Sequence, residues 1–259
     1  MLIEQEFYKK LPREFPDDIG NVLDYSCEAR MHRAKYNVLE IPNYSPIEAV
    51  RYFHIPVSTL VYWTEEPNSL VTLPSHRPRM LSFKNLVELY VLEGLRKIYG
   101  VHTSRIRSAV EFLLKTERSR HPLADYDIRT EGKSVLFYKG GKPLNASAWG
   151  QYEMEDVIGR YLHRVERDPH GVAFRLFPYT KREQIEQRLQ PPQTVEINPV
   201  VCFGLPVLAG SRITTGFLAS RHRGGDSVSS IAKSYGRPVA AIKEAIEWEI
   251  GRTVSEEAA

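Results

Sequence analysis

The chain has 259 residues, of which 42% are hydrophobic and 26% charged, and its formal net charge is +3. This composition is typical of a globular protein with one large domain or two to three small ones. The mild basicity is compatible with nucleic-acid binding without arguing for it. Two widely spaced cysteines, Cys27 and Cys202, exclude a disulfide framework or a zinc pattern.

The sequence predicts a cytoplasmic protein. Glu4, Glu6 and Lys9 interrupt any apolar region near the start, so we expect no signal peptide. No run of eighteen apolar residues occurs, so we expect no membrane span. Residues 1–43 mix charge, proline and aromatic side chains, which leaves short helices or an ordered N-terminal arm as alternatives.

A predicted helix pair follows within residues 44–120. Ser45 and Glu48 form a capping box with Pro46 in the first helical position, and this helix should bury Ile47 and Val50. After the turn 54–56, a second helix over Ser58–Thr64 should point Leu60 and Val61 inward. Two short helices joined by three residues have the form of a helix-turn-helix. Leu70–Leu73 and Arg79–Leu81 are candidate strands of a wing hairpin, with His76, Arg77 and Arg79 at its tip.

Two further helices are expected, one from Ser82 and one from Thr103 or Ser104. The apolar stripe of the second consists of Ile106, Val110, Leu113 and Leu114. This order of elements resembles the N-terminal domain of MerR-family regulators, and Thr59–Trp63 reads TLVYW where that family has TLRYY. Val61 stands where the family has arginine.

The resemblance to MerR regulators implies a winged helix-turn-helix that places its second helix in the major groove of DNA. Hydroxyl groups and arginines suit phosphate or base-edge contacts. The candidate DNA-binding residues here are Ser58, Thr59, Tyr62, Arg77 and Arg79. The alternative is a solvated surface, and this alternative applies also to Arg105 and Arg107.

Residues 121–190 predict a small α+β connector. Tyr126–Thr130 and Ser134–Tyr138 alternate as strands, and a second turn follows at residues 139–142. Apolar residues from Met154 to Val165 recur at helical spacing, and Val172–Phe177 is a further strand. A polar helical segment, 181–190, leads into the stiff pair Pro191-Pro192.

Residues 193–259 predict a second compact module. Short strands are expected at Val200–Phe203 and Pro206–Leu208, and a helix over Thr215–Arg221. A second helix-turn-helix follows, capped by Asp226 or Ser227 and interrupted by Gly236. Its candidate DNA-binding residues, or alternatively a charged face, are Arg221, Arg223, Arg237 and Lys243. Arg212 lies in an apolar turn, where we expect it to cap carbonyl groups.

This C-terminal pattern resembles the domain-of-unknown-function 433 family. The matching positions are Pro199, Gly204, Pro206, Gly210, Arg212, Ile213, Gly225, Ser227, Ile231, Ala232 and Tyr235. Ser211 stands where the family usually has threonine. The resemblance implies an antitoxin-like DNA-binding protein paired with a nuclease toxin of PIN-like fold.

Catalytic motifs are missing from the sequence, so we expect no enzyme, cofactor or metal. Gly140-Gly141-Lys142 lies between two predicted strands, where a phosphate loop would open a helix. Asp125 and Asp127 could share a face of a strand, but no further acids are near them to complete a magnesium site.

We therefore expect a mostly α protein with small β elements, of the α+β class. The whole arrangement resembles VapB-type antitoxins that carry a MerR-like domain in front of a 433-family domain. That resemblance implies a PIN-like ribonuclease toxin as partner, binding to double-stranded operator DNA, repression of the chain's own promoter, and a homodimer or higher assembly. Arg252 and the Arg221–Arg223 cluster are candidates for meeting the toxin. A stand-alone transcription regulator without a toxin is the alternative.

Overall fold

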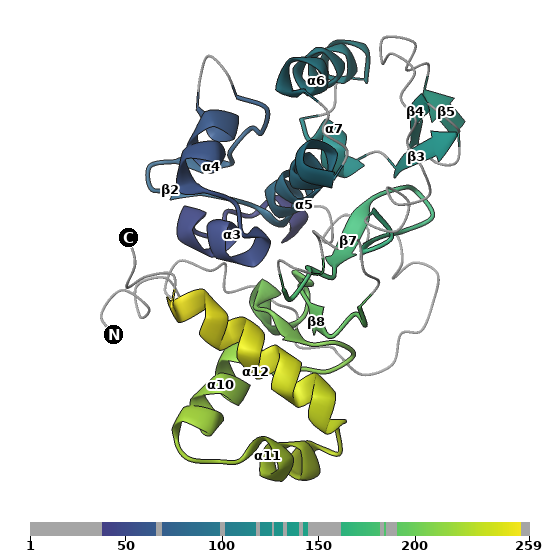
Figure 1. The fold of residues 1–259 in the computed structure, drawn as a ribbon. Coiled ribbons are helices and arrows are strands. Elements are labelled where there is room, and N and C mark those ends of the chain that lie inside the picture. Colours follow the sequence, from purple (N-terminus) through teal and green to yellow (C-terminus); the bar gives the residue numbers. More distant parts are fainter. Residues whose placement is uncertain are drawn as a thin grey trace, which may run out of the picture. The chain divides into compact units, whose positions relative to one another are not determined.

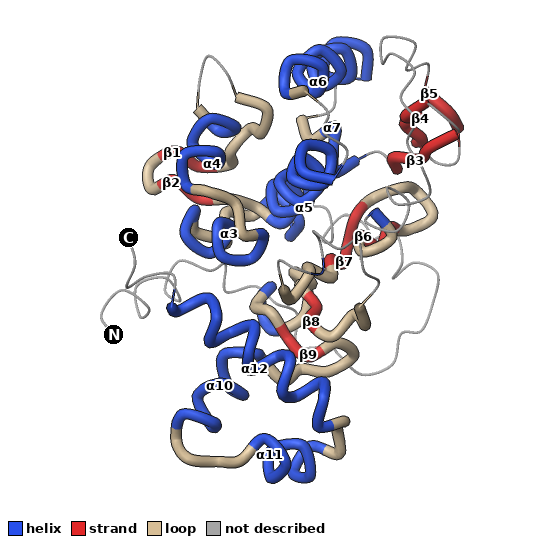
Figure 2. The backbone as a smooth tube through the Cα atoms, viewed as in Figure 1, coloured by secondary structure: helices blue, strands red, loops and turns tan. Residues whose placement is uncertain are grey.

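The described part of the fold is mostly helical with small antiparallel sheets, which confirms the expected α+β class (Figure 1, Figure 2). The structure is a computed structural model. It describes residues 38–65, 69–98, 102–117, 120–125, 127–131, 134–139, 142–144, 162–181, 184 and 191–254. All of these belong to one compact unit that begins at Asn37.

The first group of elements follows the expected order. It comprises α3 (Pro46–Phe53), α4 (Val57–Thr64), β1 (Ser75–His76), β2 (Arg79–Met80), α5 (Phe83–Glu93), the π-helical turn η1 (Gly94–Ile98), α6 (Thr103–Glu117) and α7 (Pro122–Asp125). The capping box at α3 is confirmed, since Glu48 accepts from the Ser45 amide at 2.7 Å. Ser82 caps α5 in the same way with Asn85.

Helix α5 forms the centre of this group, because every one of its residues is buried. It packs against α3, α7 and β7. The expected burial of Ile47 is wrong, since that side chain is 50% exposed while Ala49, Tyr52 and Phe53 fill the core. On α6, Leu114 likewise faces solvent, although Ile106, Val110 and Leu113 are buried as predicted.

The hairpin is shorter than the predicted wing. Leu70 and Val71 do not form a strand, because both amides donate to the carbonyl of Trp63 at the end of α4. The strands are β1 and β2, which pair Ser75 with Met80 and His76 with Arg79. Arg77 and Pro78 make the turn between them.

The middle of the chain holds two small antiparallel sheets. The first contains β3 (Asp127–Glu131), β4 (Ser134–Lys139) and β5 (Lys142–Leu144), close to the predicted strands. The second pairs β6 (Val165–Arg167) with β7 (Ala173–Leu176). Val165 therefore belongs to a strand and does not end a helix as predicted, because its backbone pairs with Leu176.

The C-terminal elements are β8 (Val195–Glu196), the 3-10 turn η2 (Cys202–Gly204), β9 (Val207–Leu208), α10 (Thr215–Arg223), α11 (Val228–Tyr235) and α12 (Val239–Val254). Helix α12 packs on α10, α11 and β9. Ser227 caps α11, and Gly236 ends it in the left-handed conformation, both as predicted. The predicted strand at Val200–Phe203 is wrong, because Cys202 and Phe203 have φ angles of 47° and 56°.

Backbone, side-chain and ring contacts join these segments. β7 is bonded to the C-terminal part through the bridge between Leu176 and Ile197. The Asn43 side chain donates to the Phe203 carbonyl at 2.7 Å, and the Tyr44 hydroxyl donates to the Gly204 carbonyl at 3.2 Å. The rings of Tyr52 and Trp248 are stacked with their centroids 5.7 Å apart.

Several predictions fall outside the described residues. These are the first 37 residues of the expected arm, the helical pattern over 154–161, most of the polar segment 181–190 and the Arg252 side chain. Among the residues that the structure describes, no helix has the length and apolarity needed to cross a membrane.

Candidate nucleic-acid interface

Helix α4 presents a polar flank to solvent. Ser58 is exposed, Tyr62 is 46% exposed and Thr59 is half-buried, while Leu60 and Trp63 anchor the opposite side of the helix in the core. With Arg96 and Thr103, the three polar residues line a shallow hollow of about 150 Å³. The structure thus brings the three α4 candidates together in one place.

Two arginines from neighbouring helices lie against this flank. Arg96 in η1 donates to the Thr59 hydroxyl at 3.5 Å, and its guanidinium lies 6.0 Å from the centre of the Trp63 ring. Arg107 on α6 donates to the Tyr62 hydroxyl at 3.3 Å and lies 5.8 Å from the centre of that ring. Hydroxyl groups beside guanidinium groups are a donor set that suits phosphate oxygens.

Arg96 is not among the candidates that the sequence predicts. It follows a helix whose residues are all buried, so no local pattern marks it as a surface residue. Its position is set by the π-helical turn at Gly94–Ile98, which places it beside Thr59, 37 residues earlier in the chain. Only the packing of η1 against α4 identifies it.

The hairpin contributes one exposed arginine. Arg77 lies in the turn and is exposed to solvent. Arg79 instead pairs with Glu65, with 2.7 Å between guanidinium nitrogen and carboxylate oxygen. An exposed pair of this kind is worth about 0–1 kcal/mol, so it can open at little cost, but Arg79 reaches a phosphate only after leaving Glu65.

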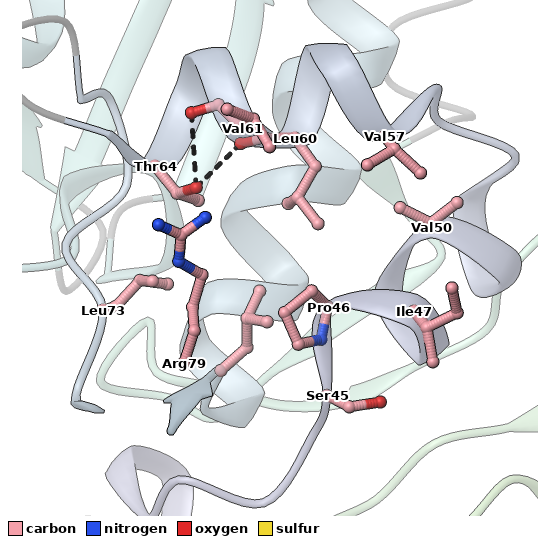
Figure 3. A pocket seen from close by; sticks show the side chains of 11 residues that line it. Ser45, Pro46, Ile47, Val50, Val57, Leu60, Val61, Thr64, Leu73 and Arg79 are labelled. Carbon is pink, nitrogen blue, oxygen red and sulfur yellow. Dashed lines mark hydrogen bonds between the residues drawn. The ribbon is translucent and has the colours of Figure 1, made fainter. Parts of the chain in front are cut away.

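An apolar hollow of about 340 Å³ lies on the other flank of α4 (Figure 3). Its lining side chains come from α3, α4, β2 and the segment before β1, and they include Ile47, Val50, Val57, Val61 and Leu73. Val57 is 56% exposed. Arg79 in its lining pairs with Glu65 and most of the other lining side chains are apolar, so this hollow suits a phosphate group less well than the polar flank does.

The basic candidates of the C-terminal helices make bonds within the chain. Arg221 binds Asp226 at 2.6 Å, and Lys243 lies 3.6 Å from Glu247 on the same helix. Arg237 donates to the Gly210 carbonyl at 3.2 Å, and Arg223 donates to the Ala219 carbonyl at 3.4 Å. The second helix pair therefore offers a weaker phosphate-binding set than α4.

The described residues contain no group of three or more histidines, cysteines or acids placed to hold a metal ion. Asp125, one of the two carboxylates noted in the sequence, pairs with Lys84 at 3.0 Å. Residues 142–144 form β5, so Lys142 begins a strand and does not open a helix.

The expected C-terminal resemblance is confirmed by comparison with known proteins. Residues 195–248 match the family model described as "Protein of unknown function (DUF433)". The chain is 24% identical over 235 residues to "Putative antitoxin VapB45" of Mycobacterium tuberculosis, and the match covers 80% of this chain and 94% of that protein. The likeness to a VapB-type protein thus extends well beyond the DUF433 region.

A solved structure has the same fold. The crystal structure of Rv2018 from Mycobacterium tuberculosis superposes with a TM-score of 0.58 and 20% sequence identity. The match covers 80% of this chain and 99% of that chain. At this identity the likeness supports the fold and says nothing further about the site.

Proposed function

We propose that this chain is the DNA-binding antitoxin of a type II toxin–antitoxin pair. In this proposal it acts in the cytoplasm, neutralises a PIN-like ribonuclease toxin by direct binding, and represses its own promoter as a homodimer or larger assembly. The observation that carries the proposal is the similarity to a VapB-type protein over 94% of that protein's length. The DUF433 match at residues 195–248 supports it.

DNA binding is assigned to the polar flank of α4. Its hydroxyl groups adjoin the guanidinium groups of Arg96 and Arg107, and Arg77 on the hairpin supplies a further cation that is exposed to solvent. A short helix flanked by arginines is suited to the major groove, where phosphate contacts fix its position. Thr59, Ser58 and Tyr62 would then be the residues nearest the bases.

Growth rescue tests the antitoxin role. The neighbouring gene is expressed alone and together with this chain. We expect the neighbour to stop growth and co-expression to restore it, with the two proteins purifying as a complex. If the neighbour is harmless, or if the purified proteins do not bind each other, the antitoxin role is wrong and the chain is a regulator without a toxin.

Salt-dependent DNA binding tests the α4 assignment separately. Binding to the DNA upstream of the chain's own gene is measured at several salt concentrations for the wild type and for Arg96→Ala with Arg107→Ala. Loss of two phosphate contacts should reduce the slope of log affinity against log salt by about 2. Lys233→Ala, which removes an exposed charge from α11, should leave the slope unchanged.

We also expect the purified chain to have no ribonuclease activity of its own. RNA incubated with the chain and Mg²⁺ or Mn²⁺ should stay intact. Cleavage that survives purification and disappears on Asp125→Asn would contradict this expectation and would assign the Lys84-paired carboxylate a catalytic role.

A further inference from the structure

Four large apolar side chains of the DUF433 region are exposed to solvent, and a backbone hydrogen bond connects the two segments that carry them. Their exposed fractions are 63% for Val200, 75% for Phe203, 49% for Leu205 and 50% for Phe217. The first three lie within six residues. Phe217 lies in the first turn of α10, whose Thr215 amide donates to the carbonyl of Pro206, the residue after Leu205. We call these four residues the Phe203 patch.

The backbone holds Phe203 in this exposed position. Both Cys202 and Phe203 are left-handed, a conformation that costs a residue with a side chain roughly 1–3 kcal/mol. The turn is fixed by the Asn43 side chain, which donates to the Phe203 carbonyl at 2.7 Å, and by the Cys202 thiol, which donates to the Arg212 carbonyl at 3.4 Å. An aromatic ring exposed by a strained and fixed turn loses little entropy on binding.

A cation lies beside the patch. Arg212 is exposed, and among the described residues its guanidinium makes no hydrogen bond or ion pair, so the expected capping of carbonyl groups is not what the structure has. Two hydrogen bonds hold the backbone of its loop in place. The Gly210 amide donates to Glu196 at 3.1 Å, and the Ser211 hydroxyl donates to the Leu208 carbonyl at 2.7 Å. An exposed positive charge therefore lies on a loop that is bonded to the turn carrying Phe203.

We propose that the Phe203 patch, with Arg212 at its side, is the surface on which the toxin protein docks. This proposal rests on the antitoxin function proposed above. The partner surface that fits it is an apolar pocket for the Phe203 ring with carboxylates at its rim to meet Arg212.

The chemistry of the patch favours a protein over DNA as its occupant. Aromatic and arginine side chains dominate the binding energy of protein interfaces, and an aromatic anchor in a partner's pocket is their usual centre. The patch offers one cation among four apolar side chains, which is a poor match for a phosphate backbone. The α4 flank, with its hydroxyl groups and arginines, has the opposite character.

Affinity for the purified product of the neighbouring gene tests the proposal. Phe203→Asn removes the ring and keeps a residue that tolerates the left-handed conformation. We expect it to weaken binding by about thirtyfold or more, as loss of a central aromatic anchor does. Val239→Asn is the matched control, since Val239 is 49% exposed at the start of α12 and lies outside the patch; its effect should be less than about threefold.

Arg212→Glu tests the charge. It should weaken binding at low salt, and the difference from the wild type should shrink as salt rises, because exposed charges are screened. Circular dichroism and the melting temperature of each variant confirm that it is folded.

The outcomes separate this proposal from the function on which it rests. If the wild type binds the neighbouring product and rescues growth, but folded Phe203→Asn binds equally well, the docking surface is wrong and the antitoxin function stands. If Phe203→Asn leaves the affinity for the toxin unchanged, but sedimentation shows that it converts a dimer of this chain to monomers, the patch joins two copies of this chain. If the wild type neither binds nor rescues, both proposals fall.

Discussion

Gly204 is required at its position for two separate reasons. Its φ angle of 79° is in the left-handed region, and a side chain there would run into the hydroxyl group of Tyr44. The Gly204 carbonyl also accepts from that same hydroxyl group, so the two residues cannot move apart without losing the bond. The glycine therefore permits close approach as well as a turn.

We predict that Gly204→Ala lowers the free energy of unfolding by roughly 2–5 kcal/mol, the sum of left-handed strain and overpacking. Gly210→Ala is the matched control, because Gly210 has a φ angle of 66° but open space where a side chain would lie. It should lose only the strain, about 1–2 kcal/mol. Urea unfolding of both variants measures the difference. Equal losses would show that the approach of Tyr44 does not matter.

A second prediction concerns the buried pair of His121 and Glu88, whose closest atoms are 3.1 Å apart. Burial lowers the pKa of His121, but the hydrogen bond and charge of Glu88 outweigh it, so the net pKa is raised. Burial raises the pKa of Glu88. A raised pKa in the folded state means that the stabilisation is present at low pH and is lost as pH rises through the folded-state pKa.

The free energy of unfolding should therefore fall as pH rises above 6.5, the ordinary pKa of histidine, by at most about 1.4 kcal/mol per pH unit. Denaturant unfolding between pH 6 and 9 measures this. His121→Gln should remove the fall, whereas His76→Gln, in the exposed hairpin, should keep it. A fall of the same size in His121→Gln would mean that other groups cause it.

At the scale of elements, α12 fixes the neighbouring segments through its carboxylates. Glu244 accepts hydrogen bonds from the hydroxyl groups of Thr180 and Thr194, the second at 2.6 Å. Glu249 accepts from Thr215 at the start of α10. The helix therefore binds three segments by polar bonds in addition to its apolar face.

We predict that Glu244→Ala lowers the free energy of unfolding by about 3–6 kcal/mol, since it removes two hydrogen bonds to a charged acceptor. Glu247→Ala on the same helix is the control. Glu247 is 42% exposed and pairs with Lys181 and Lys243, and such surface pairs are worth about 0–1 kcal/mol. Thermal unfolding compares the two variants. Similar losses would show that the Thr180 and Thr194 bonds contribute little.

The sequence predicts these elements well where the hydrogen bonds that define them join residues close together in the chain. Ser45, Ser82 and Ser227 cap helices through residues three positions away, so their helix starts were predictable. Val200–Phe203 has the apolar run of a strand, but Asn43, 160 residues away, holds Phe203 in a turn. No local pattern carries such information.

The candidate site shows the same division. The sequence predicts Ser58, Thr59 and Tyr62 as candidates because all three are polar residues of one short helix. Arg96 is not among these candidates, because its role depends on η1 lying beside α4. Arg79 was predicted as a DNA-binding residue of the wing, but it forms an ion pair with Glu65, and no local sequence pattern indicates the contact between these two elements.

At the scale of the whole molecule, the described residues from 38 onward form one compact unit, although the sequence suggests separate modules. Tyr52 of α3 stacks on Trp248 of α12, and both rings are nearly fully buried. Asn43 and Tyr44, just before α3, bind the turn at Phe203 and Gly204. The element pair assigned to DNA and the patch assigned to the toxin are thus joined directly.

We therefore predict that the chain unfolds in one cooperative thermal transition, with a calorimetric enthalpy equal to the van't Hoff enthalpy. Trp63→Ala, in α4, and Ile242→Ala, in α12, each remove a buried side chain and should cost about 2–5 kcal/mol. If the contacts at Tyr52 and Phe203 couple the two regions, both substitutions shift the same transition by lowering its midpoint. Differential scanning calorimetry of the three proteins measures this. Two transitions, each moved by only one of the substitutions, would mean that the two regions fold independently.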